Sequence, residues 1–190
     1  MKKILFVAVL AFASVMAYAQ PRAIGGRLGA FNGVSYEHGF GDSNMLEIEA
    51  GFGFAGRTTR WVDGRPYRSY GHNIQAAVTY DWIDPFGAKF PEMPKGEWHW
   101  YMGVGGAAGY GWYGYGYLPE HGYIGGNGNW GFLGAAGRVG VEFDFWFPLQ
   151  LSIDWRPTLG VGLWDNYDHG VNSGLYWEMT SLALGVRYKF

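Results

Sequence analysis

Apolar and polar residues alternate strictly along several segments of the chain. In residues 44–55, Leu46 and Ile48 share one face with further apolar residues, whereas Glu47 and Glu49 share the other face with glycine. A period of two is that of a β-strand, whose successive side chains point to opposite faces. The same alternation recurs in residues 73–83, 97–110, 132–145, 149–161 and 181–190. The pattern therefore predicts strands with one apolar face each.

Strands with one apolar face occur in two architectures: a soluble β-sandwich and a membrane barrel. In a sandwich the apolar faces form the core, whereas in a membrane barrel they meet lipid and the polar faces fill the lumen. The polar faces here carry glycine, alanine and charges of both signs, as a narrow lumen requires. Aromatic residues gather near the strand ends, as in membrane girdles. One predicted rim holds Trp98, Trp100, Phe145, Trp146 and Phe147, and the other holds Tyr110, Trp112, Tyr113, Trp130 and Trp164.

We therefore predict an all-β fold, an up-and-down, eight-stranded antiparallel transmembrane β-barrel. Its first two strands flank Asn32-Gly33, a strong hairpin signal. A strict two-residue loop would turn Glu37 toward lipid, which is costly, so we favour a three-residue loop that places Glu37 inside, opposite Gly29. The seven connections are predicted near residues 32–34, 41–43, 56–72, 84–96, 111–131, 146–148 and 162–175. Connections three, five and seven are long and two and six are tight, which is typical of outer-membrane barrels.

The first residues carry the features of a secretory signal peptide. Lys2 and Lys3 precede an apolar run, and Ala17-Tyr18-Ala19 supplies a small-x-small cleavage site. The apolar run is too short for a membrane-spanning helix, which needs about 20 residues. We predict cleavage after Ala19, which divides the chain into a signal peptide, residues 1–19, and one barrel domain, residues 20–190.

Composition and charge exclude several classes of function. Cleavage would lower the number of basic residues from 14 to 12, against 16 acidic residues. A net negative charge of this kind does not favour nucleic-acid binding. The chain has no cysteine, and so no disulfide framework and no thiolate metal site. We predict no cofactor, no bound metal and no nucleic-acid partner.

Charged residues on the polar faces form the best-defined constellation. An eight-stranded barrel has an interior just wide enough for side chains to fill it, and arginine forks can pair with carboxylates there. We interpret these charges as a structural plug, with Arg138 paired to Glu142 or Asp144; a proton or ion path is the alternative. The predicted lumen network comprises Arg27, Glu37, Glu47, Glu49, Asp81, Arg138, Glu142, Asp144, Asp154, Arg156 and Arg187.

Two segments resemble known outer-membrane proteins. The ending from Gly185 to Phe190 resembles the C-terminal strand of outer-membrane barrels, and the segment from Leu151 to Pro157 looks like a strand of small Bacteroidetes-type barrels. In size and layout the chain is similar to the OmpA/OmpX-like group. The resemblance implies a monomer in the outer membrane of a Gram-negative bacterium, in contact with its lipids and lipopolysaccharide. It also implies that Tyr188 and Phe190 present the last strand to the assembly machinery.

The third connection is rich in arginine and offers a candidate ligand-binding surface. Arginine forks bind phosphate and carboxylate, so an outer loop of this kind can contact anionic lipid or glycan. A plain solvated loop is the alternative interpretation. The residues concerned are Arg57, Arg60, Trp61, Arg65 and Arg68. We predict a structural or surface-interaction protein that is not a large-pore porin.

The second function hypothesis is a lipid A-modifying enzyme that transfers or removes an acyl chain. Such chemistry needs a nucleophile beside its base, with a third group to orient the base. Among five histidines, His72 alone lies at a predicted outer strand end with a serine, Ser69, nearby in sequence. That is not a catalytic constellation, and we predict no catalytic residue.

Overall fold

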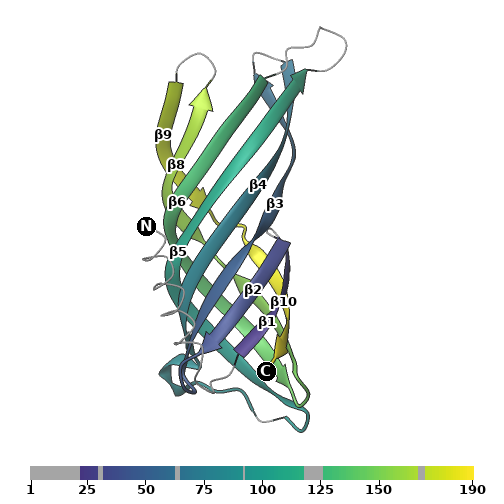
Figure 1. Ribbon diagram of the computed structural model, residues 1–190, viewed down its shortest axis with the longest axis vertical. Coiled ribbons are helices and arrows are strands. Elements are labelled where there is room, and N and C mark those ends of the chain that lie inside the picture. Colours follow the sequence, from purple (N-terminus) through teal and green to yellow (C-terminus); the bar gives the residue numbers. More distant parts are fainter. Residues whose placement is uncertain (1–21, 30–31, 63–64, 92, 118–125, 167–169) are drawn as a thin grey trace, which may run out of the picture.

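The computed structural model describes residues 22–29, 32–62, 65–91, 93–117, 126–166 and 170–190, with the backbone alone for 22, 54–62, 65–70, 113–117, 126–127, 164–166 and 170–172. Within these residues the secondary structure is almost entirely β (Figure 1). The strands are β1 (Arg22–Gly29), β2 (Asn32–Gly39), β3 (Asn44–Val62), β4 (Arg65–Ile83), β5 (Gly96–Tyr117), β6 (Gly126–Phe145), β7 (Leu149–Trp155), β8 (Thr158–Asn166), β9 (Gly170–Glu178) and β10 (Leu182–Lys189), and one 3₁₀ turn, η1, covers Pro85–Gly87. No described helix is long and apolar enough to cross a membrane.

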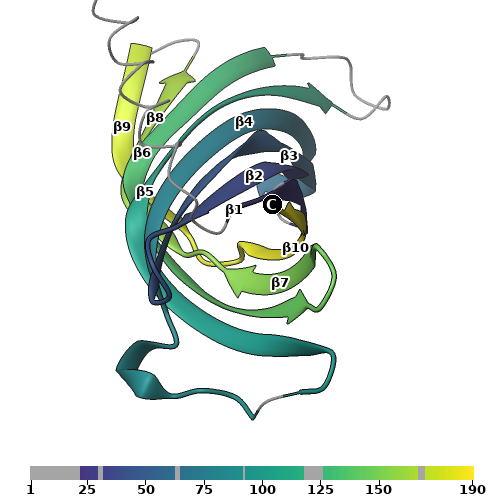
Figure 2. The same ribbon diagram turned by 60° about the horizontal axis from the view of Figure 1, so that its bottom comes forward.

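Antiparallel pairing closes the sheet into a ring of eight strands. Each strand from β1 to β6 pairs with the next along the chain, and β10 pairs with both β7 and β1. The predicted all-β, eight-stranded antiparallel barrel is confirmed. Figure 2 shows the curl of the sheet from below.

β7 and β8 together form the seventh strand of the barrel, and β9 and β10 form the eighth, each with a short break between its two parts. β8 pairs with the upper part of β6, and β9 pairs with β8. Arg156 and Pro157 separate β7 from β8, since proline has no N–H to donate to the ladder. Backbone hydrogen bonds still bridge the break, from Gly137 N to Pro157 O (2.9 Å) and from Arg156 N to Ser181 O (2.9 Å).

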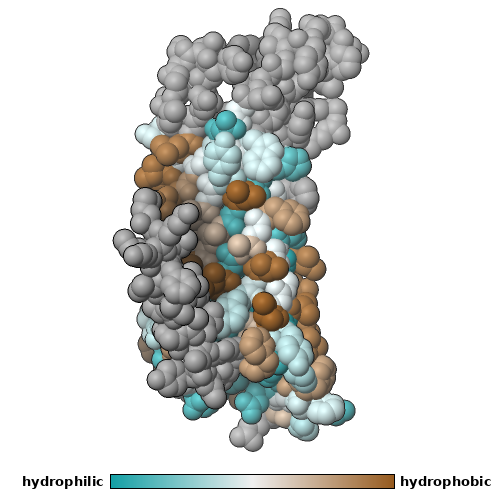
Figure 3. Space-filling view, viewed as in Figure 1, coloured by the Kyte–Doolittle hydropathy of each residue, from teal (hydrophilic) through white to brown (hydrophobic). Residues whose placement is uncertain are grey.

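The predicted alternation of faces is confirmed along the strands. On β4 the side chains of Ile74 and Val78 are exposed on the outer surface, whereas Thr79 and Asp81 are buried. On β10 Leu184 is exposed and Arg187 is buried. The space-filling view shows hydrophobic patches across the middle of the molecule (Figure 3). Apolar side chains thus cover the outside of the barrel, and polar ones fill its terminal half.

The wall of the barrel is not of equal height. β1 and β2 have 8 residues each, whereas β3 and β4 have 19 and β5 has 22. We call the end near Arg22 and Phe190 the terminal end, and the opposite end, toward which β3–β6 extend, the loop end (Figure 1). The closed ring occupies the terminal half of the molecule, because β1 and β2 end partway along their neighbours.

The predicted long loops are wrong in extent. Residues 56–72, 111–131 and 162–175 belong mostly to strands, since β3 and β4 pair as far as Val62–Arg65 and β5 and β6 as far as Tyr115–Gly126. Threonine, tyrosine and tryptophan favour extended pairs, and alternating glycine does not interrupt them here. The connections predicted near 41–43, 84–96 and 146–148 are confirmed, because they lie between consecutive strands.

The predicted turn at residues 32–34 is also wrong. β1 ends at Gly29, and Asn32 and Gly33 are already the first residues of β2. The Oδ1 atom of Asn32 accepts a hydrogen bond from Gly29 N (3.2 Å), so Asn32 links the start of β2 to the end of β1. Glu37 is inside, as predicted, but it lies opposite Ala23 rather than Gly29.

Gly33 is required by a close approach between β2 and β3. A Cβ atom on Gly33 would lie 2.7 Å from the Cα of Gly51, whereas on Gly26 its nearest neighbour would be Gly33 O at 3.8 Å. We expect Gly33→Ala to lower the free energy of unfolding by about 1–3 kcal/mol, because β2 must move away from β3. Urea unfolding in detergent measures this, and Gly26→Ala is the matched control. Equal stability of the two variants would contradict the close approach.

Candidate functional site: the charged lumen

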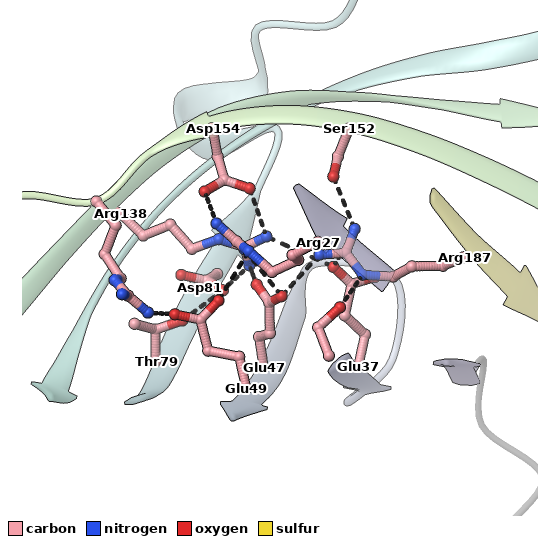
Figure 4. Close-up of polar contacts among 12 residues, drawn as sticks. Arg27, Glu37, Glu47, Glu49, Thr79, Asp81, Arg138, Ser152, Asp154 and Arg187 are labelled. Atoms are coloured by element: carbon pink, nitrogen blue, oxygen red, sulfur yellow. Dashed lines mark hydrogen bonds and ion pairs between the residues drawn. The ribbon is translucent and has the colours of Figure 1, made fainter. Parts of the chain in front are cut away.

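The strand register brings charged residues from seven strands, and Arg156 from the break after β7, together in the lumen. Because these residues occupy inward positions of paired strands, they meet across the barrel although they lie far apart in the sequence. In Figure 4 their side chains point toward one another from opposite walls. The buried members are Arg27, Glu37, Glu47, Glu49, Asp81, Arg138, Glu142, Asp154, Arg156 and Arg187.

Arg138, on β6, is the centre of one half of this network. Its NH1 atom donates a hydrogen bond to Asp81 Oδ2 (2.7 Å) and contacts Glu47. Its NH2 atom donates to Tyr101 Oη (2.9 Å) and contacts Asp154 Oδ2 (3.3 Å). The guanidinium carbon lies 4.3 Å from the centre of the Tyr101 ring. Arg138 therefore joins β3, β4, β5 and β7 through the middle of the barrel.

Arg27 and Arg187 complete the network from β1 and β10. Arg27 contacts Glu47 Oε1 through NH1 (3.1 Å) and Glu49 Oε2 through Nε (2.8 Å). Arg187 donates from NH2 to Glu47 Oε1 (2.6 Å) and contacts Glu37 Oε1 through NH1 (3.1 Å). Glu47 is thus in contact with three guanidinium groups, and charge compensation at this depth depends on several strands at once.

The two predicted partners of Arg138 are wrong. Glu142 accepts a hydrogen bond from Gln150 Nε2 (3.1 Å), and Asp144 pairs with Lys189 Nζ (3.1 Å). Both carboxylates lie nearer the terminal end than Arg138, because successive inward positions on a strand are separated along the barrel.

The loop-end half of the lumen has a different lining. Phe132 and Tyr176 stack with their ring centres 4.1 Å apart, and Trp130 stacks on both. Trp130 therefore points inward, and its predicted place in the outer aromatic rim is wrong. The register of β6 contained the signal, since Trp130 and Phe132 stand at even positions with the inward Arg138.

Several residues of the network carry no charge, and sequence reasoning missed them. Tyr101 is fully buried and donates to Asp154 Oδ2 (3.2 Å). Ser35 and Ser152 each accept a hydrogen bond from Arg187, at 2.7 Å. Thr79 donates to Asp81 Oδ2 (3.1 Å). Their inward parity was the available signal for the serines and the threonine, because each lies two residues from a buried charge on its own strand.

The remaining predicted residues lie elsewhere. Arg57, Arg60, Trp61, Arg65 and Arg68 are on the paired ends of β3 and β4, and their side chains lie outside the described residues. His72 is on the outer face, with its ring centre 6.1 Å from that of Trp112, and the side chain of Ser69 lies outside the described residues. Tyr188 and Phe190 are exposed on the outer face at the terminal end. In the part of the chain that the structure describes, no group of three or more side chains could hold a metal ion.

Comparison with known proteins supports the fold of this chain but assigns it to no family. No family model and no curated protein matches the sequence. Among solved structures, the chain is similar to the crystal structure of a major outer membrane protein from Thermus thermophilus, with a TM-score of 0.52 and 14% sequence identity. The likeness covers 91% of this chain and 100% of that chain. At this identity it supports the barrel fold alone.

Arg138→Leu tests the network. The substitution leaves Glu47, Asp81 and Asp154 buried with fewer cations, and we expect a loss of about 3–5 kcal/mol in the free energy of unfolding. The matched control is Lys189→Met, whose pair with Asp144 is partly exposed, and we expect at most about 1 kcal/mol there. Urea unfolding followed by gel mobility of unboiled samples measures both. Comparable losses in the two variants would show that burial of the pairs does not decide stability.

Proposed function

We propose that this chain is an outer-membrane β-barrel protein of a Gram-negative bacterium, with a structural or surface-interaction role. The observation that carries the proposal is the combination of an apolar outer wall with a lumen crossed by paired charges. In a closed barrel every backbone N–H and C=O group within the lipid has a hydrogen-bond partner, so a barrel with an apolar outer wall can span a bilayer. The proposal includes the OmpA/OmpX-like type, a Bacteroidetes-like origin and a monomeric state.

The same proposal orients the barrel and names its contacts. We place the terminal end in the periplasm, because the connections between β2 and β3 and between β6 and β7 are short there, as outer-membrane barrels require. The loop end then faces outward, where the arginines between 57 and 68 meet lipopolysaccharide or anionic glycan. Export by the signal peptide, residues 1–19, is part of the proposal, and this segment lies outside the described residues.

The charged lumen argues for a plug rather than a channel. Arg138 and Arg187, each at 1% exposure, cross the interior together with Glu47, at 2%. A solute path through this network would have to break several buried ion pairs, each of which is costly to separate. The proposal therefore assigns the chain neither a porin activity nor a catalytic step.

Planar-bilayer recording tests the plug directly. We expect the purified barrel to give no persistent conductance of the size of a porin channel, because the charged network fills the lumen. Glu47→Ala serves as the comparison, since it removes the carboxylate that three arginines share. A stable, large conductance of the unmodified protein would overturn the proposal of a closed lumen.

Deletion of Phe190 tests the proposed assembly role of the last strand. β10 is hydrogen-bonded to both β1 and β7, so the finished barrel should lose only about 1–3 kcal/mol with one exposed ring. We expect the variant to refold in detergent and to accumulate poorly in the outer membrane. Surface abundance is measured against Leu182→Ala, which removes an apolar side chain from the opposite end of β10. Normal abundance of the Phe190 deletion would contradict the assembly role.

A further inference from the structure

The terminal end of the barrel opens into a cavity of about 1480 Å³. It is bordered by the ends of several strands, by the turn after β4 and by the turn between β6 and β7. Its lining is acidic, because six carboxylates face two lysines and His99, which contacts Asp84 (2.8 Å) and Glu97 (3.5 Å). The carboxylates are Glu37, Asp42, Asp84, Glu97, Glu142 and Asp144, and the lysines are Lys89 and Lys189.

Glu142, on the inner wall of this cavity, is a buried carboxylate that forms no ion pair with a described residue. It is 3% exposed, and its hydrogen bond from Gln150 Nε2 is its only polar side-chain contact in the described part of the chain. Its neighbours are compensated, since Glu37 lies 3.1 Å from Arg187 and Asp144 lies 3.1 Å from Lys189. A buried charge is normally paired with an opposite charge, whereas Glu142 forms no ion pair with a described residue.

Gln150 adds a second acceptor at the same place. Its side chain is 4% exposed and lines the cavity, and its Oε1 atom is buried without a hydrogen-bond partner among the described residues. The Nε2 atom already donates to Glu142, so Oε1 offers only lone pairs. An amide oxygen without a hydrogen-bond partner on β7 therefore lies beside the buried carboxylate of Glu142 on β6.

The numbers of buried acidic and basic residues in the lumen also indicate an uncompensated negative charge. Among the buried residues, six carboxylates stand against four arginines, so negative groups exceed positive ones by two. All four arginines are in ion pairs, Arg156 with Glu49 and the other three with Glu47. The excess therefore falls at the cavity, where Glu142 has no arginine within ion-pair distance in the described residues.

We propose that the cavity binds an aliphatic diamine or polyamine. One ammonium group, with three N–H donors, contacts Glu142 and Gln150 Oε1. A second ammonium lies near the exposed carboxylates at the opening, Asp42 and Glu97, and the hydrocarbon chain runs past Met45 and Phe145, which also line the cavity. A metal ion fits less well, because no described group of three or more ligating side chains is present.

The test is titration of the refolded barrel in detergent with 1,5-diaminopentane at physiological salt. Tryptophan fluorescence reports binding, because Trp82 and Trp146 line the cavity. We expect saturable binding, at least about tenfold tighter than that of 1-aminopentane, and none of pentanedioate, which carries two negative charges. Binding should also raise the melting temperature, because the ligand stabilises only the folded state.

Glu142→Gln separates binding from folding. The variant removes an unpaired buried charge and keeps the shape, so it should fold with unchanged or higher stability, and diamine affinity should fall by about tenfold or more. Glu178→Gln is the matched control, because Glu178 lies on β9 in the other half of the barrel, and its affinity should stay within about twofold.

Two results would overturn the proposal. One is equal affinity of the unmodified protein and Glu142→Gln for 1,5-diaminopentane, which would place the amine elsewhere. The other is no saturable binding by a folded, unmodified barrel, which would show that the cavity does not take up a diamine. Neither result bears on the conductance or on the location of the barrel, so failure here is distinguishable from failure of the proposed function.

Discussion

The contacts between guanidinium groups and carboxylates inside the barrel constrain everything else in this structure. Eight strands enclose a space that side chains must fill, and here charge fills its terminal half. Glu47 on β3 needs Arg27 from β1, Arg138 from β6 and Arg187 from β10, so its compensation exists only when the ring is closed. A slip of one residue in any of these strands would turn a charge toward the apolar side. The same contacts therefore set the register of the strands and the closure of the ring.

The periodic part of the fold was predictable because it has a local cause. A period of two fixes which side chains share a face, and Glu47, Asp81 and Arg138 are buried as the alternation predicts. The pairing of those charges was not predictable, since Arg138 meets Asp81 only through the stagger of strands around the ring. The place of a charge was thus readable from its own strand, whereas its partner depends on three or four other strands.

Strand ends were harder to predict because local signals there compete with pairing. Asn32-Gly33 has the composition of a turn, yet Gly33 is needed where β2 approaches Gly51 on β3. The glycine- and tyrosine-rich residues around 111–117 resemble a loop in composition, yet they pair with β4. Trp130 has the chemistry of a membrane girdle, but its position in β6 turns it inward onto Phe132 and Tyr176. In each case a long-range neighbour decides what the segment does.

The unequal height of the wall divides the molecule into two mechanical parts. In the terminal half every strand has a neighbour on both sides, so the ring resists shear as a unit. Toward the loop end, β3 beyond Phe52 pairs only with β4, and β9 pairs only with β8, within the described residues. That half is a sheet fixed at its base and free along two margins, held by the aromatic stack rather than by ion pairs. Local opening begins where backbone hydrogen bonds have the fewest neighbours, so amide protons along these two margins should exchange with solvent well before those of the ring.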